Sequence, residues 1–174
     1  MNPTSMVPVL EHDGTFLSES MAICEYIDEV FPDSGYPLLS RTCPFERYEV
    51  RRLCEIINSG TQPLMSKRTC ARIVAAGGKE DPWAKESIST GLGHFEKVLE
   101  RTSKDRRFCF GNTVSLADAF LIPMLYKGAY YGVHSEDFPV IHSVAQNLKA
   151  MPEFFYAEPE NQLDAPVSES EEDF

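Results

Sequence analysis

The sequence predicts an α+β chain of two unequal units, a β-hairpin with one helix followed by a larger all-helical unit. Three observations support this prediction. The strand-like stretch VPVL precedes an Asp13-Gly14 turn, the proline-bracketed stretch PDSGYPLLSRTCP follows, and apolar residues then recur at helical spacing. The 174 residues, 43% of them hydrophobic, are enough to bury a core.

The first unit, residues 1–33, is expected to form two strands and a helix. Residues 7–10 form the first strand, Asp13-Gly14 the hairpin turn, and residues 15–17 the returning strand. A helix then begins at Ser18 and ends before Pro32. Its residues at helical spacing are Ile23, Tyr26, Ile27 and Val30.

The second unit, residues 44–166, is expected to be helical throughout, after a linker at 34–43. A first long helix starts at about Phe45, is interrupted by NSGTQP, and resumes until a Gly-Gly pair ends it. The next helix carries a core stripe of Ile88, Leu92, Phe95 and Leu99. A uniformly apolar helix begins near Ser115, and one more is marked by Val140, Ile141, Val144 and Leu148. The acidic tail at 167–174, which contains SESEED, is expected to be disordered.

Charge and cysteine usage exclude several classes of protein. The net charge of −11 argues against nucleic acid or an anionic membrane as partner, because both require a basic face. Five cysteines without a C-x-x-C pair argue against a disulfide framework and a zinc site, so we expect no metal. The sequence has no apolar run of membrane-spanning length and no signal-peptide pattern, and a reducing cytoplasmic location is predicted.

Val7-Pro8 stands at the entry to the first strand. Proline cannot donate to a sheet ladder, so it belongs at a sheet edge or at the first position of a strand. A cis bond would turn the backbone N–H and C=O of Val7 outward, toward a ligand. A proline that protects an edge strand from aggregation explains the same pattern, and the residues alone leave both interpretations open.

Glu19 and Ser20 lie where the helix of the first unit begins. The unpaired N–H groups and the positive end of the helix dipole favour a bound carboxylate there. The Ser20 hydroxyl adds a hydrogen bond, and Glu19 could meet a ligand ammonium. Plain N-capping by Ser18 or Ser20 accounts for the same residues.

The motif Ser-Leu-Ala-Asp, from Ser115 to Asp118, predicts a capping box for the apolar helix that follows. The Asp118 carboxylate reaches back to the Ser115 N–H, and the Ser115 hydroxyl accepts from the Asp118 N–H. Because such a box satisfies the helix terminus, we assign both residues a structural role.

In this order the motifs resemble the glutathione transferase family, and within it the zeta class, whose archetype is maleylacetoacetate isomerase. The segments that carry the resemblance are NPTSMVP, SMAICEYIDEVFP, INSGTQPL, GNTVSLADAFLIP and MPEFFYAEPENQLDAP. The resemblance implies a thioredoxin-like domain that binds glutathione as a cosubstrate, and an all-helical domain that supplies most of the second-substrate pocket.

The resemblance also implies a role for each motif of the first unit. Val7 would pair with the cysteinyl backbone of glutathione, and Pro8 would be the family's cis-proline. Glu19 and Ser20 would bind the γ-glutamyl end, where zeta proteins usually have Gln-Ser. The carboxylate of Glu19 favours a contact with the ammonium group of that end.

In the helical unit, Gln62 would approach glutathione across the domain interface, and Ser66 and Arg68 align less closely in the same segment. The arginine that pairs with a dicarboxylate substrate in zeta isomerases aligns with Tyr130, which we place in the second-substrate pocket. A phenol lacks the bidentate fork of a guanidinium, so the substrate preference is expected to differ.

The family's first strand, helix and second strand, with a Ser-Ser-Cys type motif that activates the thiol, would lie upstream of Met1. We therefore expect an N-terminally truncated thioredoxin-like fragment and assign no catalytic residue. The implied function is glutathione-dependent isomerisation or conjugation of a small electrophile, in aromatic amino acid catabolism, by a cytoplasmic homodimer. The alternative is a non-catalytic transferase-like module for binding or dimerisation.

Overall fold

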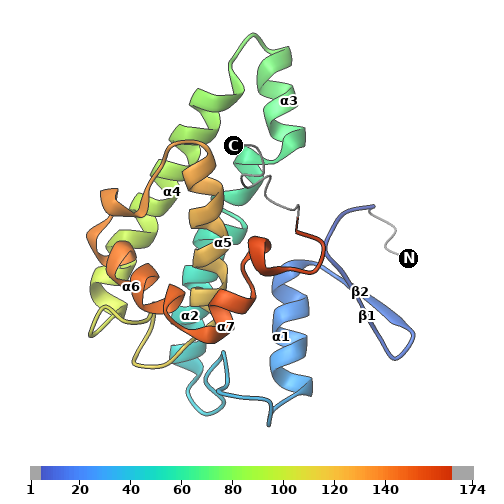
Figure 1. Ribbon diagram of the computed structural model, residues 1–174, viewed down its shortest axis with the longest axis vertical. Helices are drawn as coiled ribbons and strands as arrows, with labels where there is room; N and C mark the ends of the chain where they lie inside the picture. Colours follow the sequence, from blue (N-terminus) through green and yellow to red (C-terminus); the bar gives the residue numbers. More distant parts are fainter. Residues whose placement is uncertain (1–4, 166–174) are drawn as a thin grey trace, which may run out of the picture.

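The structure, a computed structural model, describes residues 5–165, so the predicted acidic tail lies outside the described residues. A β-hairpin and one helix lie to one side of a larger helical unit, as predicted (Figure 1). The hairpin unit consists of β1 (Val9–His12), β2 (Thr15–Ser18) and α1 (Ser20–Val30). The helical unit consists of α2 (Pro44–Asn58), α3 (Lys67–Ala75), α4 (Glu80–Thr102), α5 (Leu116–Tyr130), α6 (Pro139–Lys149) and α7 (Pro152–Tyr156). Three 3-10 turns accompany them: η1 (Gln62–Met65), η2 (Ser135–Asp137) and η3 (Pro159–Asn161).

The hairpin differs from the prediction where β1 begins and where β2 ends. The two strands pair antiparallel, with Val9 opposite Ser18 and His12 opposite Thr15. Because Ser18 pairs within the sheet, the prediction of a helix beginning at this residue is wrong, and α1 begins at Ser20. The first strand likewise begins at Val9, which leaves Val7-Pro8 outside the ladder.

The hydrophobic core lies within the helical unit, around α5. This helix packs against α2, α4 and α6, and eight of its residues are buried, which agrees with its uniformly apolar sequence. The fully buried side chains of the core include Leu53, Ile88, Phe95, Leu121 and Val144. Among the described residues, the hairpin unit has a single buried apolar residue, Ile23, so the stability of the described chain comes mainly from the helical unit.

Asp118 anchors the start of α5, and the predicted capping box is present. One carboxylate oxygen accepts from the N–H and the hydroxyl of Ser115, each at 2.7 Å. The other accepts from the N–H of Cys109 at 2.8 Å, so the carboxylate also holds the preceding loop. Burial raises the pKa of Asp118, and these hydrogen bonds oppose part of that rise.

The two units are joined by polar contacts that fix the direction of α1. Arg51 of α2 holds Glu25 of α1 with two hydrogen bonds, 2.6 and 2.9 Å long. In the linker, the N–H of Leu38 donates to the Asp28 carboxylate of α1 at 2.7 Å, and its carbonyl accepts from Leu116 of α5 at 3.0 Å. The linker therefore ties α1 to the capped end of α5.

Gly91 allows α4 to approach the turn after α2. A Cβ on this residue would overlap the hydroxyl of Thr61 and lie 2.8 Å from its Cβ, and Thr61 is buried. We therefore predict that Gly91→Ala lowers the free energy of unfolding by about 1–3 kcal/mol, because the Thr61 turn must shift. Urea denaturation followed by circular dichroism measures the change.

Gly93, two residues further along α4, provides the matched control. A Cβ there would meet nothing within 4 Å, so alanine should raise the free energy of unfolding by up to about 1 kcal/mol through its better helix propensity. Equal effects of the two alanine substitutions would show that close packing at Gly91 is unimportant.

Candidate functional site

The hairpin brings the two motifs of the first unit to the same end of the sheet. The strand ladder ends at the Val9–Ser18 pair, so Val7 and Pro8 precede this pair on one side and Glu19 and Ser20 follow it on the other. This open end of the hairpin is where β2 leads into α1 (Figure 1). Residues that lie eleven or more positions apart in the sequence can therefore contact one ligand.

Val7 is exposed to solvent. Its side chain is among the most exposed apolar groups of the described chain, at 90% of full exposure, so packing does not explain a valine here. The Val7–Pro8 bond is cis, as the resemblance implies. Val7 therefore lies exposed just ahead of β1, outside the ladder.

Glu19 occupies a backbone conformation that a residue with a side chain rarely adopts. Its φ of 75° and ψ of 112° lie outside the favoured regions, and its side chain is exposed. Backbone strain of this kind concentrates at ligand-binding sites, where the surrounding structure over-determines the conformation. Glu19 is also the N-cap residue of α1.

The α1 terminus has no side-chain cap, so the interpretation of Ser18 or Ser20 as a plain cap is wrong. Ser20 is the first residue of the helix and is exposed. The first N–H groups of α1 therefore have no acceptor from the side chain of the N-cap residue, and they lie at the positive end of the helix dipole. An anionic ligand group would satisfy them.

The predicted ligand residues of the helical unit fall into two groups. Gln62 is exposed at the start of η1, where its amide is available to a ligand. Ser66 caps α3 by accepting from the N–H of Thr69 at 3.2 Å, which explains this serine without a ligand. Arg68 is exposed in the first turn of α3.

Tyr130 is the last residue of α5 and is 79% exposed. Its ring meets that of Tyr131 edge to face, with 4.9 Å between ring centroids. The ammonium of Lys127, a residue that no motif singled out, lies against both rings. The signal was present in the sequence, because side chains three and four residues apart on a helix are neighbours.

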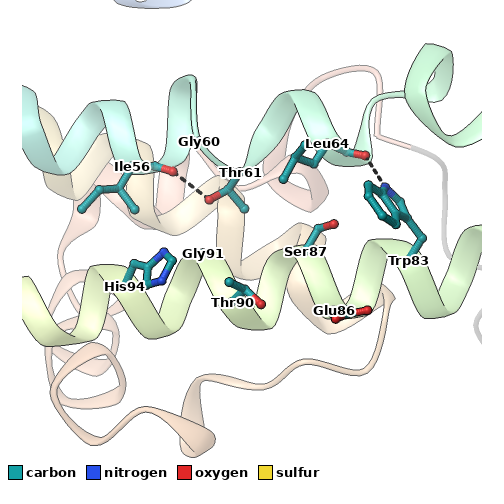
Figure 2. Close-up of a pocket in the computed structure, with 10 residues that line it drawn as sticks. All are labelled: Ile56, Gly60, Thr61, Leu64, Trp83, Glu86, Ser87, Thr90, Gly91 and His94. Carbon is teal, nitrogen blue, oxygen red and sulfur yellow. Dashed lines mark hydrogen bonds between the residues drawn. The ribbon is translucent and has the colours of Figure 1, made fainter.

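A groove of about 460 Å³ lies elsewhere, between α4 and the segment that connects α2 with η1 (Figure 2). Trp83 closes one end by donating its indole N–H to the carbonyl of Leu64 at 2.8 Å. Thr61 donates its hydroxyl to the carbonyl of Ile56 at 2.7 Å. None of the predicted ligand residues lines this groove, so we place the candidate site at the open end of the hairpin.

Residues 5–165 give no support for a metal site or for a membrane-spanning helix. This part of the chain contains no group of three or more His, Cys, Asp or Glu side chains placed to hold a metal ion. Its helices also include none that is long and apolar enough to cross a membrane.

Comparisons with known proteins agree on one family. Residues 1–30 match the family model described as glutathione S-transferase, N-terminal domain. The maleylacetoacetate isomerase of Dictyostelium discoideum is 36% identical over 168 residues, which cover 95% of this chain and 74% of the relative.

Solved structures give the same result. The maleylacetoacetate isomerase of Anaeromyxobacter dehalogenans, with glutathione bound in its active site, is 35% identical and superposes with a TM-score of 0.84 over 95% of this chain and 76% of its own. A bacterial maleylpyruvate isomerase described as a zeta-class glutathione S-transferase is 28% identical, with a TM-score of 0.86 over 95% of this chain and 78% of its own.

Proposed function

The chain belongs to the zeta class of the glutathione S-transferase family, and on that premise we propose that it is a glutathione-dependent isomerase or transferase. Glutathione is its cosubstrate, and the second substrate is a small molecule with an electrophilic carbon. The relatives named above are isomerases of maleylacetoacetate and maleylpyruvate, so a cis double bond conjugated to a carbonyl group is the first candidate for the electrophile.

The observation that carries the proposal is the strained, exposed Glu19 at the uncapped start of α1. Its carboxylate can receive the ammonium of the γ-glutamyl group, while the helix N–H groups receive the neighbouring carboxylate. Val7, just ahead of β1, can pair through its main chain with the cysteinyl residue of glutathione. These contacts would hold the peptide and leave its thiol directed at the second substrate.

The reaction consists of an addition and its reversal. The glutathione thiolate forms a C–S bond to the alkene carbon, and the π electron pair moves onto the conjugated carbonyl oxygen as an enolate. The former double bond then rotates as a single bond. When the enolate electrons return, the double bond reforms in the trans geometry and the C–S bond breaks, so no proton or electron is consumed. We assign no residue of the described chain to activation of the thiol.

The test combines calorimetric titration with glutathione and an assay of maleylacetoacetate isomerisation with and without glutathione. We expect saturable glutathione binding, and isomerisation that requires glutathione. Binding without isomerisation would favour the alternative of a non-catalytic module. Absence of glutathione binding would overturn the proposed function and leave only a dimerisation module.

A homodimer is part of the proposal, and α2 offers a surface for it. Phe45 and Tyr48 are exposed side by side, with 6.1 Å between ring centroids, and the Arg52 guanidinium lies 5.9 Å from the Tyr48 ring centroid. Aromatic residues and arginine are enriched at the centres of protein interfaces. Sedimentation equilibrium should give a dimer for the native chain and a monomer for Tyr48→Glu; a monomeric native chain would contradict the proposal.

We also propose a cytoplasmic location. All five cysteines are free thiols, three of them buried, which suits a reducing compartment. Fractionation of cells that produce the protein should recover it with soluble cytoplasmic markers, and recovery from an oxidising compartment would contradict this assignment.

A further inference from the structure

The groove along α4 contains a buried serine hydroxyl that the fold leaves without a partner. Ser87 is 9% exposed, and its hydroxyl makes no hydrogen bond within residues 5–165, not even to the carbonyl four residues earlier in the helix. Figure 2 shows this hydroxyl pointing from α4 toward the segment that carries Thr61 and Leu64. Because burying a hydroxyl without a partner costs free energy, a ligand that bonds to Ser87 would recover this loss.

Three other polar side chains of the groove have no proton to donate to a ligand. Thr61 gives its hydroxyl proton to the carbonyl of Ile56, so its oxygen can only accept. Trp83 gives its indole N–H to the carbonyl of Leu64. Glu86, three residues along α4 from Trp83, is a carboxylate and therefore an acceptor. This arrangement suits a ligand that brings its own N–H donors.

The charge of the groove favours a cation. The described residues that line it include one carboxylate, Glu86, and no lysine or arginine. The net charge of −11 on the whole chain acts in the same direction. Trp83 and Glu86 are neighbours on one face of α4, and indole is the aromatic ring that attracts a cation most strongly. An ammonium group would therefore meet a carboxylate, an aromatic ring and the Ser87 hydroxyl in one region of the groove.

The opposite wall of the groove is apolar, and the groove has the size of a small-molecule site. Ile56 and Leu64 supply apolar side chains from the segment that faces α4. The volume of about 460 Å³ lies within the range of sites that bind small organic ligands. An alkyl or aryl group can therefore lie along this wall, in the direction of His94 (Figure 2).

We infer that the groove binds a small apolar amine in its protonated form. The ammonium group donates to the Ser87 hydroxyl oxygen and is attracted by the exposed Glu86 carboxylate, and the apolar body lies against Ile56. This inference is independent of the proposed function, because the residues that we expect to contact glutathione do not line the groove.

Calorimetric titration with phenethylamine at neutral pH tests the inference. This amine is protonated there, as a lysine side chain is. We expect saturable binding, accompanied by a change in protein fluorescence, because Trp83 is the one tryptophan of the chain. Phenylpropionate, an anion of similar size, should not bind. Added salt should weaken the binding of the amine, because Glu86 is exposed.

Three variants locate the amine in the groove. Ser87→Ala should bind phenethylamine about 10-fold or more weakly, the change that loss of a hydrogen bond to a charged group produces. Glu86→Gln should bind it about 2- to 5-fold more weakly and with less dependence on salt, since an exposed ion pair contributes little. Ser89→Ala is the matched control, because Ser89 is an exposed serine of α4 that does not line the groove, and its affinity should be unchanged.

Several results would overturn the inference. They are the absence of saturable binding, equal affinities for phenethylamine and phenylpropionate, and equal affinities of Ser87→Ala and Ser89→Ala for the amine. Alanine favours a helix, so circular dichroism should show both alanine variants folded. Sedimentation equilibrium tests the competing occupant: if the amine dissociated a dimer, a second copy of the chain would occupy the groove. Glutathione carries a net negative charge and should not displace the amine, and displacement would also contradict the inference.

Discussion

Replacing Asp118 with alanine should lower the free energy of unfolding by about 3–5 kcal/mol, the largest loss that we expect from a single substitution in this chain. The carboxylate is fully buried and accepts three hydrogen bonds, two from Ser115 and one from Cys109. Alanine would leave two buried N–H groups and a hydroxyl without an acceptor. It would also release the loop before α5, the helix at the centre of the core. Urea denaturation followed by circular dichroism measures the loss.

Asp105→Ala is the control for this prediction. Asp105 also accepts from a backbone N–H, that of Arg107 at 3.1 Å, but it is exposed. Water can replace this carboxylate, so the expected loss is below about 1 kcal/mol. If Asp118→Ala and Asp105→Ala unfold at the same urea concentration, burial and the three hydrogen bonds do not make Asp118 more important for stability than Asp105.

The contribution of Asp118 to stability should change with pH in the direction opposite to that of most aspartates. Because burial raises the pKa of Asp118 in the folded state, the folded chain binds this proton more tightly than the unfolded chain. The contribution of Asp118 is therefore greatest below the ordinary aspartate pKa of about 3.9, and falls as pH rises through the folded-state pKa. The difference in the free energy of unfolding between the native chain and Asp118→Asn should therefore become smaller as pH rises from about 3.9 through the folded-state pKa of Asp118.

Glu19→Gly should change stability and ligand affinity in opposite directions. Glycine accommodates the φ of 75° that strains Glu19, so relief of strain should raise the free energy of unfolding by about 1 kcal/mol. The same change removes the carboxylate that we propose receives the ammonium of glutathione. We expect glutathione affinity to fall about 10-fold or more, as for loss of one charge-assisted hydrogen bond. Thermal denaturation and calorimetric titration of one sample measure the two effects.

Glu29→Gly is the matched control, because it removes the same side chain from the same helix. Glu29 is exposed near the other end of α1, roughly 15 Å along the helix axis. Glycine inside a helix should lower the free energy of unfolding by about 0.5–1 kcal/mol and leave glutathione affinity unchanged. If Glu19→Gly destabilises the chain as Glu29→Gly does, the conformation of Glu19 is not strained.

Much of the fold could be predicted from the sequence, because its signals are local. The Asp13-Gly14 turn, the stripe that contains Ile88 and Phe95, and the box at Ser115 each depend on neighbouring residues. The start of α1 was placed two residues early because Ser18 is committed to the sheet, a tertiary effect that helix spacing does not reveal.

The candidate site was predictable in part. Motifs identify Val7 and Glu19, whereas their position at the same end of the hairpin follows from the pairing of the two strands. The strain at Glu19 is a backbone property that a sequence does not specify. Ser66 illustrates what alignment leaves out, since the structure gives it the role of a helix cap while its ligand contact stays a prediction.

Mapping glutathione on the chain by backbone amide NMR tests the central claim most directly. If glutathione binds at the open end of the hairpin, the largest shifts during titration should fall on the amides of Val7, Glu19 and Ser20, with smaller shifts at Gln62. Shifts centred on the residues around Trp83 and His94 would instead place the ligand in the groove along α4, and would contradict the account.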